Sequence, residues 1–329
     1  MKKRVLGRTD LQVTELSLGG LFVSSIGGRG YDEAERAVHR AFDLGVNYVD
    51  TAPGYADSEA VLGKALKGVK KPYILSTKLG GRPQPFNPKD KDGLRRSVDE
   101  SLRLLGRDHI DIMFVHEPDR PGQFDWWEDP MRFVGPVTEV LADLKRQKIV
   151  KFTGLGGTTV YEMVRIIETG QYDVVLTAFN YSLLWQEARR FVVPAAKKQN
   201  MGIVIGSPLH QGALARRYDD EINAGAPWMT PMRREQFKKL YSFVDEINVP
   251  LHELGLRSVI SNPDVSCVLM GARSAEEVEQ NVRAVDAGPL PADVLARLDE
   301  IANMLPLRPY CEPGWVPLGV KGYRGPAGL

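Results

Sequence analysis

Four residues suited to acid–base chemistry lie at or just after the ends of short apolar runs. Asp50 closes the run NYVD and Tyr55 follows in the next loop, while Lys78 closes YILSTK and His116 closes IDIMFVH, just before Glu117. A free phenol has a pKa of about 10, so Tyr55 needs a nearby ammonium to exchange protons near neutral pH. We expect Asp50 to hold Lys78 charged and Lys78 to lower the pKa of Tyr55. A neutral His116 would then donate a hydrogen bond to a carbonyl oxygen.

Each of these residues alone also has an ordinary structural explanation. An aspartate after a strand often caps a loop, a tyrosine often lies half-buried at a rim, and a lysine is usually solvated. A single histidine is more often a hydrogen-bonded structural residue. The combination is what indicates chemistry: it would protonate an oxygen while hydride reaches the attached carbon. No side chain supplies hydride, so the set implies a nicotinamide cofactor.

The elements that must position this set follow a repeating pattern. Helix-like segments with apolar residues at three- and four-residue spacing, such as 32–45, 58–68, 92–106 and 135–147, separate short apolar runs. The predicted strands are 13–20, 47–50, 73–78, 110–116, 150–157, 173–180, 202–209 and 265–272. Parallel strands need such crossovers, and eight strand–helix units close into a (β/α)₈ barrel of about 250 residues. The active site of such a barrel lies at the carboxyl ends of its strands.

The remaining residues extend the barrel within a single domain, 1–329. We expect an N-terminal hairpin at 3–12, longer loops at 79–91, 117–130 and 210–232, and a C-terminal helix near 291–304 followed by an irregular tail. The alternative fold is an open, doubly wound parallel sheet, which the count of eight strands disfavours.

The composition limits the class of protein. The chain has 329 residues, of which 43% are hydrophobic and 26% charged, and its formal charge is +1. This balance gives no reason to expect a nucleic acid or an anionic membrane as partner. The two cysteines, Cys267 and Cys311, lack metal-ligand spacing, and neither a secretory segment nor a membrane span is apparent. We therefore expect a reduced, cytoplasmic protein without a metal.

The sequence resembles the aldo-keto reductases over nearly its whole length. The resemblance runs from LGRTDLQVTELSLGG through NYVDTAPGYADSEAVLGKAL, STK and VHEPD to VSCVLMGARSAEEVEQNVRAV. It implies that Tyr55 is the general acid/base, that Asp50 and Lys78 tune it, and that His116 orients the carbonyl. It also implies NADP as cofactor, with NAD not excluded, and a small carbonyl compound or sugar as substrate.

Two further segments resemble the cofactor loops of that family. In GSPLHQGAL, the backbone around Ser207, Leu209 and Gly212 would bind a pyrophosphate, although an ordinary proline turn would look similar. In GARSAEEVEQN, the residues implied at the adenine end are Gly271, Ala272, Arg273 and Asn281. A helix beginning near Ser274 would favour a phosphate. Glu277 stands where many NADP-preferring members have an arginine, which leaves Arg273 to supply the charge.

The nicotinamide end departs from the common family pattern. Members commonly have a Ser-Asn pair, a glutamine and a tyrosine where this chain has Gly156-Gly157, Ala178 and Gly206, and Asn180 is a plausible substitute. Glycines and small residues at these positions are similar to the sugar-oxidising branch that includes L-galactose and L-fucose dehydrogenases.

Aromatic residues occur in two segments near the expected site. Phe124, Trp126 and Trp127 follow His116, and the tail adds Tyr310, Trp315 and Tyr323. Such rings can stack on a sugar or aryl substrate, or they can simply pack the long loops or a subunit contact.

Two other functional classes are alternatives to an oxidoreductase, and the sequence disfavours the second. Some members of the resembled family are regulatory channel subunits that bind cofactor and sense redox state with little turnover. A metal-dependent barrel hydrolase would need clustered histidines and carboxylates, which this sequence does not offer.

Overall fold

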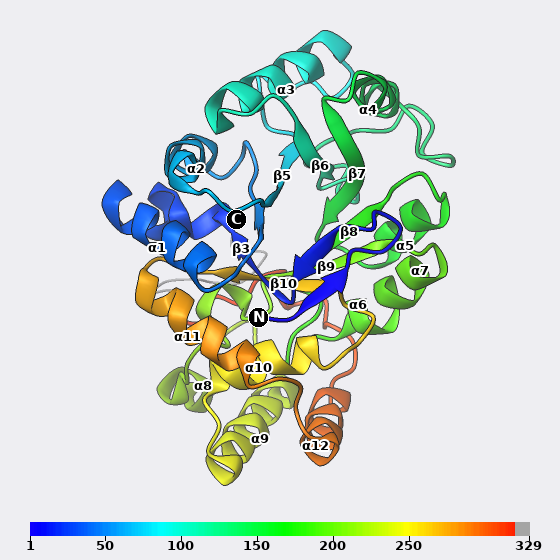
Figure 1. Cartoon of the computed structure of the whole chain (residues 1–329). Coiled ribbons are helices and arrows are strands. Elements are labelled where there is room, and N and C mark those ends of the chain that lie inside the picture. The colour runs from blue at the N-terminus through cyan, green and yellow to red at the C-terminus, as the bar shows by residue number, and fades with distance from the viewer. Residues whose placement is uncertain (320–329) are drawn as a thin grey trace.

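Eight parallel strands close into a barrel in the computed structural model, which describes residues 1–319 (Figure 1). Each strand pairs with the next along the chain, and β10 pairs with β3 to close the ring. This confirms the predicted barrel and excludes the open sheet. The strands are β3 (Leu16–Gly19), β4 (Tyr48–Asp50), β5 (Ile74–Leu79), β6 (Ile110–His116), β7 (Val150–Gly157), β8 (Val174–Ala178), β9 (Gly202–Gly206) and β10 (Cys267–Gly271).

Helices surround the barrel and bury apolar faces against it. The predicted helical periodicity is confirmed, and Gly106 ends α3 in a left-handed conformation, with φ of 63°. No helix within residues 1–319 combines the length and apolar character needed to cross a membrane. The surrounding helices are α1 (Tyr31–Asp43), α2 (Ser58–Ala65), α3 (Lys91–Leu105), α4 (Pro136–Arg146), α5 (Tyr161–Glu168), α6 (Glu187–Arg190), α7 (Val192–Lys198), α10 (Leu251–Ile260) and α11 (Ala275–Asp286).

An antiparallel hairpin closes the amino end of the barrel. It consists of β1 (Lys3–Val5) and β2 (Gln12–Thr14), so its second strand extends slightly beyond the predicted 3–12. Leu6 and Val13 are fully buried within the apolar cluster of the barrel interior. The hairpin therefore plugs one end of the barrel and leaves the opposite end for a site.

The strand residues alternate between the barrel interior and the surrounding helices. In β4, Tyr48 belongs to the interior cluster and Val49 to the cluster beneath the helices. Asp50 is the next residue, and successive strand side chains point to opposite faces, so Asp50 returns to the interior side. The same parity in β5 and β6 turns Lys78 and His116 inward at their carboxyl ends.

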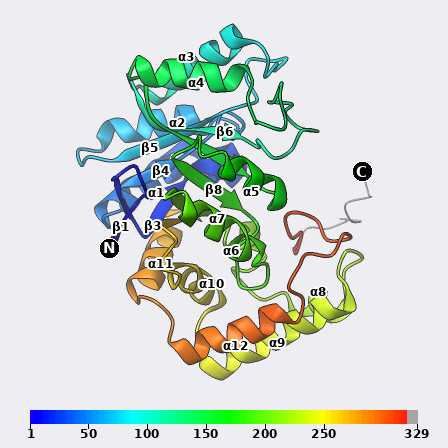
Figure 2. The ribbon, with the colours of Figure 1, turned by 90° about the vertical axis from the view of Figure 1, so that its right-hand side faces the viewer.

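A second apolar cluster lies beside the barrel, built from the insertion after β9 and the end of the chain. Its helices are α8 (Asp219–Ala224), α9 (Pro231–Ile247) and α12 (Ala292–Asn303), and α9 packs along α12 (Figure 2). The predicted long loop and C-terminal helix are present, whereas α9 was not expected from the sequence. Val316 and Leu318 of the tail are buried in the same cluster. The tail is thus part of a packed core.

Candidate active site

The last inward-facing residue of each strand forms a ring at the carboxyl end of the barrel. The ring has two unlike arcs. One carries charged and titratable side chains, contributed by three consecutive strands: Asp50, Lys78 and His116. The other carries only glycine and alanine, contributed by the remaining five: Gly156, Ala178, Gly206, Gly271 and Gly19. The first arc can perform acid–base chemistry, and the second leaves room for a ligand beside it.

Lys78 is the centre of the charged arc. Its side chain is only 1% exposed, and its Nζ atom donates to Asp50 Oδ2 at 2.6 Å and to the Thr51 carbonyl at 2.7 Å. Ser76 Oγ donates to the other oxygen of Asp50 at 2.6 Å. Burial lowers the pKa of Lys78, but Asp50 and then Tyr55 outweigh burial, and the net pKa is raised above its ordinary value. Lys78 therefore stays charged beside Asp50 and Tyr55.

Tyr55 lies beside this ammonium. Nζ of Lys78 is 4.8 Å from the centre of the Tyr55 ring. The net pKa of the phenol is nevertheless raised, because the effect of burial exceeds the opposing charge of Lys78, and Asp50 adds to the increase. This differs from the lowered pKa expected from the sequence, since the depth of the phenol could not be known there. The phenol is therefore neutral and carries its proton at physiological pH.

His116 faces Tyr55 from the end of β6. The two rings meet edge to face with centroids 5.9 Å apart. Burial lowers the pKa of His116 to about 3, and the charges of Lys78 and Arg120 contribute. The imidazole is therefore neutral. Its Nδ1 atom is buried and has no hydrogen-bond partner among residues 1–319.

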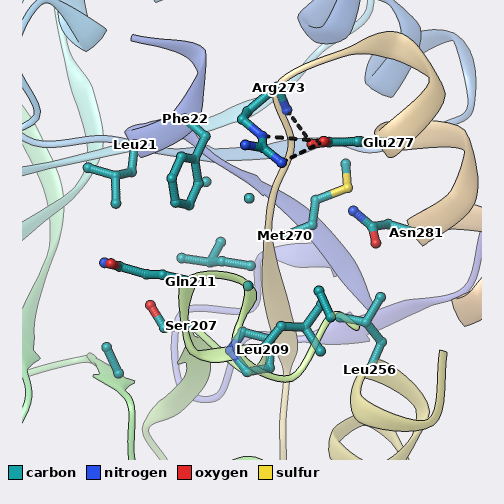
Figure 3. Close-up of a pocket in the computed structure, with 18 of the residues that line it drawn as sticks. Leu21, Phe22, Ser207, Leu209, Gln211, Leu256, Met270, Arg273, Glu277 and Asn281 are labelled. Carbon is teal, nitrogen blue, oxygen red and sulfur yellow. Dashed lines mark hydrogen bonds and ion pairs between the residues drawn. The ribbon is translucent and has the colours of Figure 1, made fainter. Parts of the chain in front are cut away.

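A cavity of about 300 Å³ extends from the charged arc across the small-residue arc. Figure 3 shows residues that line it, among them Phe22, Ser207 and Asn281. Asp50 and Tyr55 line one end, and Asn281 and Glu277 of α11 line the other. Ala178 and Gly206 belong to its lining between these ends. The cavity therefore joins the candidate acid–base group to the amino end of a helix, where backbone N–H groups favour a phosphate.

Most of the predicted cofactor residues line this cavity. From the loop after β9 and the β10–α11 segment, all but one are present: Ser207, Leu209, Gly212, Gly271, Arg273, Glu277 and Asn281. The exception is Ala272, which is fully buried in the apolar core and does not line the cavity. The predicted N-cap is found, since Ser274 Oγ accepts from the Glu277 N–H at 3.3 Å. Arg273 pairs with Glu277, with NH2 and Oε1 3.0 Å apart (Figure 3). The positive charge of Arg273, which was expected to meet a 2′-phosphate, is thus balanced by Glu277.

Three further predicted cofactor residues do not line the cavity. Gly156 belongs to the ring, and a Cβ atom there would lie 3.6 Å from Lys78 Cε. A Cβ atom at Gly157 would overlap the side-chain ends of Met163 and Asp119, so this glycine lies closely packed against both. Asn180 donates from Nδ2 to the carbonyls of Thr158, at 2.7 Å, and Ala178, at 3.0 Å. Its amide thereby fixes the loop after β7.

The predicted substrate aromatics differ in their surroundings. Trp126 is fully buried and donates from Nε1 to the His116 carbonyl at 2.9 Å. Trp127 packs edge to face on Phe133, with centroids 5.7 Å apart. Phe124 is partly exposed, with its ring centroid 6.4 Å from that of His116. Of the three, Phe124 alone is both partly exposed and in ring contact with His116. Tyr323 of the tail lies outside the described residues.

Several cavity residues were missed from the sequence. Leu21 and Phe22 of the 3₁₀ helix η1 (Gly20–Val23) and Gln211 of η4 (His210–Gly212) line the cavity. A Cβ atom at Gly271 would lie 2.5 Å from Phe22, so the ring covers that glycine closely. The only available signal was the position of Leu21 and Phe22 directly after the first predicted strand.

Neither cysteine contributes to the site. Cys267 is buried in the barrel interior and Cys311 is exposed, and both are unpaired. Residues 1–319 contain no group of three or more histidine, cysteine or carboxylate side chains able to hold a metal ion.

Comparisons with known proteins agree with this architecture. The model of the aldo/keto reductase family matches residues 16–303. The chain is 31% identical to pyridoxal 4-dehydrogenase of Microbacterium luteolum, covering 85% of this chain and 92% of that one, and 29% identical to L-galactose dehydrogenase of Arabidopsis thaliana, covering 86% and 87%. The holo form of aldo-keto reductase AKR11C1 from Bacillus halodurans superposes with a TM-score of 0.76 at 28% identity, covering 92% and 96%. These matches support an oxidoreductase, and the chain belongs to the aldo/keto reductase family.

Proposed function

We propose that the protein is an NAD(P)-dependent oxidoreductase that exchanges hydride at the carbonyl or alcohol carbon of a small aldehyde, ketone or sugar. The observation that carries this proposal is the fully buried Lys78 ammonium, held between Asp50 and the Thr51 carbonyl beside the Tyr55 phenol. Burying an ammonium is costly unless it is paired, and here the pair faces the Tyr55 phenol at the cavity end. Family membership and dehydrogenase relatives point to the same chemistry.

The roles of the side chains follow from their protonation states. Tyr55 is the general acid when a carbonyl is reduced, because its raised pKa keeps it protonated. Lys78 stabilises the phenolate that remains after the proton leaves, and Asp50 keeps Lys78 charged and oriented. Neutral His116 donates a hydrogen bond to the carbonyl oxygen and sets its direction. A bound nicotinamide would supply or accept the hydride.

The cavity fits a dinucleotide of this kind. Small residues at Ala178 and Gly206 leave space next to Tyr55, and Ser207 to Gly212 form a tight turn in which Ser207 has a φ of 51°. Glycine and turn N–H groups would hold the pyrophosphate there, and the amino end of α11 would hold the adenosine end. NADP follows from the family pattern. The Arg273–Glu277 pair leaves NAD as the alternative, because it balances the charge that a 2′-phosphate would need.

Sugars and related hydroxylated compounds are the substrate class we favour. The relative L-galactose dehydrogenase is named for a sugar substrate. In this chain, Phe124 offers a partly exposed ring beside His116 for stacking on such a compound.

The test is a spectrophotometric assay of wild type and Tyr55→Phe at the reduced-nicotinamide absorbance. NAD, NADP and their reduced forms are each combined with aldoses, polyols and aromatic aldehydes. We expect Tyr55→Phe to lose roughly 10²- to 10⁴-fold in kcat while cofactor binding is retained. Tyr161→Phe is the matched control, because that phenol is 64% exposed on α5.

Two results would contradict the proposal. A Tyr55→Phe enzyme with near wild-type kcat would remove Tyr55 as the proton donor. Cofactor binding by the wild type without turnover of any compound in the panel would favour a regulatory, redox-sensing role instead.

A further inference from the structure

Glu117 is a carboxylate next to the acid–base group for which the reaction described above has no use. It follows His116 directly, and its backbone N–H donates to the Gly156 carbonyl at 2.7 Å, which fixes the turn after β6. Its side chain is 12% exposed. The Glu117 charge also contributes to the raised pKa of the Tyr55 phenol, so the carboxylate lies within electrostatic range of the proposed proton donor.

The two oxygens of Glu117 differ in their partners. Oε2 accepts a hydrogen bond from Thr158 Oγ1 at 2.7 Å and lies 3.5 Å from NH1 of Arg120. Oε1 accepts none from residues 1–319, and it is not among their buried unpaired polar atoms. One oxygen is therefore engaged and the other is open to a ligand.

Neighbouring residues hold this arrangement in place. Asp119 is buried, and its Oδ2 accepts from the Thr158 N–H at 3.0 Å. Asn180 donates to the Thr158 carbonyl at 2.7 Å. Both backbone groups of Thr158 are thus tied, and its hydroxyl is presented to Glu117. The carboxylate is positioned before any substrate arrives, which reduces the entropy lost on binding.

The free oxygen selects for a particular kind of substrate. An apolar molecule placed over Glu117 would remove water from Oε1 without replacing its hydrogen bond, which is unfavourable for a buried carboxylate. An anionic molecule would be repelled. Arg120 already balances much of the charge, so a neutral hydroxyl donor satisfies the site better than a cation does.

We propose that Oε1 of Glu117 accepts a hydrogen bond from a substrate hydroxyl near the reacting carbon, so that the protein prefers hydroxylated aldehydes, ketones and sugars over apolar carbonyl compounds. This assignment rests on the proposed oxidoreductase function and makes Glu117 its specificity-determining residue.

The test compares two three-carbon aldehydes, glyceraldehyde and propanal, with rates referred to the free, unhydrated aldehyde. Only glyceraldehyde carries hydroxyls. We expect wild type to prefer it, and Glu117→Ala to lower the ratio of the two kcat/KM values by roughly 10- to 100-fold. Any effect of the substitution on the phenol, the cofactor or the fold acts on both aldehydes and cancels in the ratio.

Two further variants sharpen the measurement. Glu117→Gln keeps the shape and one acceptor oxygen, so it should retain an intermediate ratio and guards against a folding defect in Glu117→Ala. Glu128→Ala is the control, since this exposed glutamate lies in the same loop, and its ratio should equal that of wild type.

The outcomes separate this assignment from the function on which it rests. Turnover of both aldehydes with an unchanged ratio in Glu117→Ala, or no wild-type preference, would overturn the role of Glu117 and leave the oxidoreductase intact. Absence of Tyr55-dependent turnover by wild type with either aldehyde and either reduced cofactor would overturn the proposed function, and this assignment with it.

Discussion

Two buried ion pairs, one in the barrel and one beside it, differ in the groups that surround them. Lys78 and Asp50 are 2.6 Å apart with side-chain exposures of 1% and 3%, and Arg233 and Glu312 are 2.9 Å apart with exposures of 0%. Lys78 donates to Asp50 and to the Thr51 carbonyl, and its Nζ atom also lies 4.8 Å from the centre of the Tyr55 ring.

The second pair lies outside the cavity lining. Glu312 accepts from Arg233 Nε at 2.9 Å and from Trp185 Nε1 at 3.0 Å, and the guanidinium lies over the Trp185 ring at 4.2 Å. Arg233 also donates to Gln236. Two pairs of similar burial therefore have different consequences: the pair enclosed by other side chains fixes the tail to α9, whereas the pair at the cavity lies beside a phenol.

The largest expected effect is on turnover, at the first pair. Lys78→Met removes the charge that stabilises the phenolate of Tyr55, and we expect kcat to fall by roughly 10²- to 10⁴-fold. The assay is steady-state kinetics, with the melting temperature measured in parallel because Asp50 is left unpaired. Lys238→Met, which alters an exposed pair with Glu235, is the control. A kcat within threefold of wild type would mean that the barrel pair is as purely structural as the other one.

The next effect is on stability, at the second pair. Glu312→Gln leaves the Arg233 charge buried without a counter-ion, and we expect the free energy of unfolding to fall by about 3–5 kcal/mol. Glu246→Gln breaks an exposed pair with Arg297 and should cost about 1 kcal/mol or less. Urea unfolding of both variants measures the difference. Equal losses for the two variants would show that burial does not distinguish these pairs.

A buried neutral histidine lies near each of the two ion pairs, which predicts that the free energy of unfolding depends on pH. Burial lowers the pKa of His116 to about 3 and that of His210, which packs on Trp185 with centroids 4.4 Å apart, well below its ordinary value. Below pH ~6.5 the unfolded chain binds protons that the folded chain does not, until the folded pKa is reached. The free energy of unfolding therefore decreases as pH falls, by up to about 1.4 kcal/mol per pH unit for each histidine.

This dependence is measured by urea unfolding at pH 7, 6 and 5. His116→Gln should reduce the slope of the free energy of unfolding against pH by an amount that corresponds to at most one proton. His109→Gln is the comparison variant, because His109 is a partly exposed residue before β6. A stability that does not change over this range, or an unchanged slope in His116→Gln, would contradict a neutral buried imidazole.

The smallest effect concerns an exposed pair at the far end of the cavity. Glu277→Gln frees Arg273 from its partner, and we expect the ratio of NAD to NADP dissociation constants to rise about two- to fivefold, in the range of a surface ion pair. Fluorescence titration with each cofactor measures it, with Glu276→Gln on the same helix as control. A ratio that shifts toward NAD would show that Arg273 does not face the 2′-phosphate.

The fold and the position of the charged arc were predictable because both follow local patterns. Alternating strands and helices fix the barrel, and strand parity places Asp50, Lys78 and His116 at one end of its interior. The α11 start at Ser274 was likewise readable from its side chain and the following glutamates. Such features depend on neighbouring residues in the sequence.

What the sequence could not provide depends on contacts between distant segments. For Trp126, stacking on a substrate and packing of the long loop were both open from the sequence, and the buried indole, which donates to the His116 carbonyl, packs the loop. Phe22 approaches Gly271 only because β10 pairs with β3. The net pKa of Tyr55 depends on how deeply the phenol lies, which no spacing reports.

The packed tail shows that the folded unit extends beyond the segment that matches the family model. The family match ends at residue 303, yet Glu312, Val316 and Leu318 are buried against α9 and its neighbours. A chain shortened to the family boundary would retain the Arg233 cation and lose its only carboxylate partner among the described residues. Stepwise C-terminal deletion should therefore show an abrupt loss of soluble yield once Glu312 is removed, and not at the end of α12.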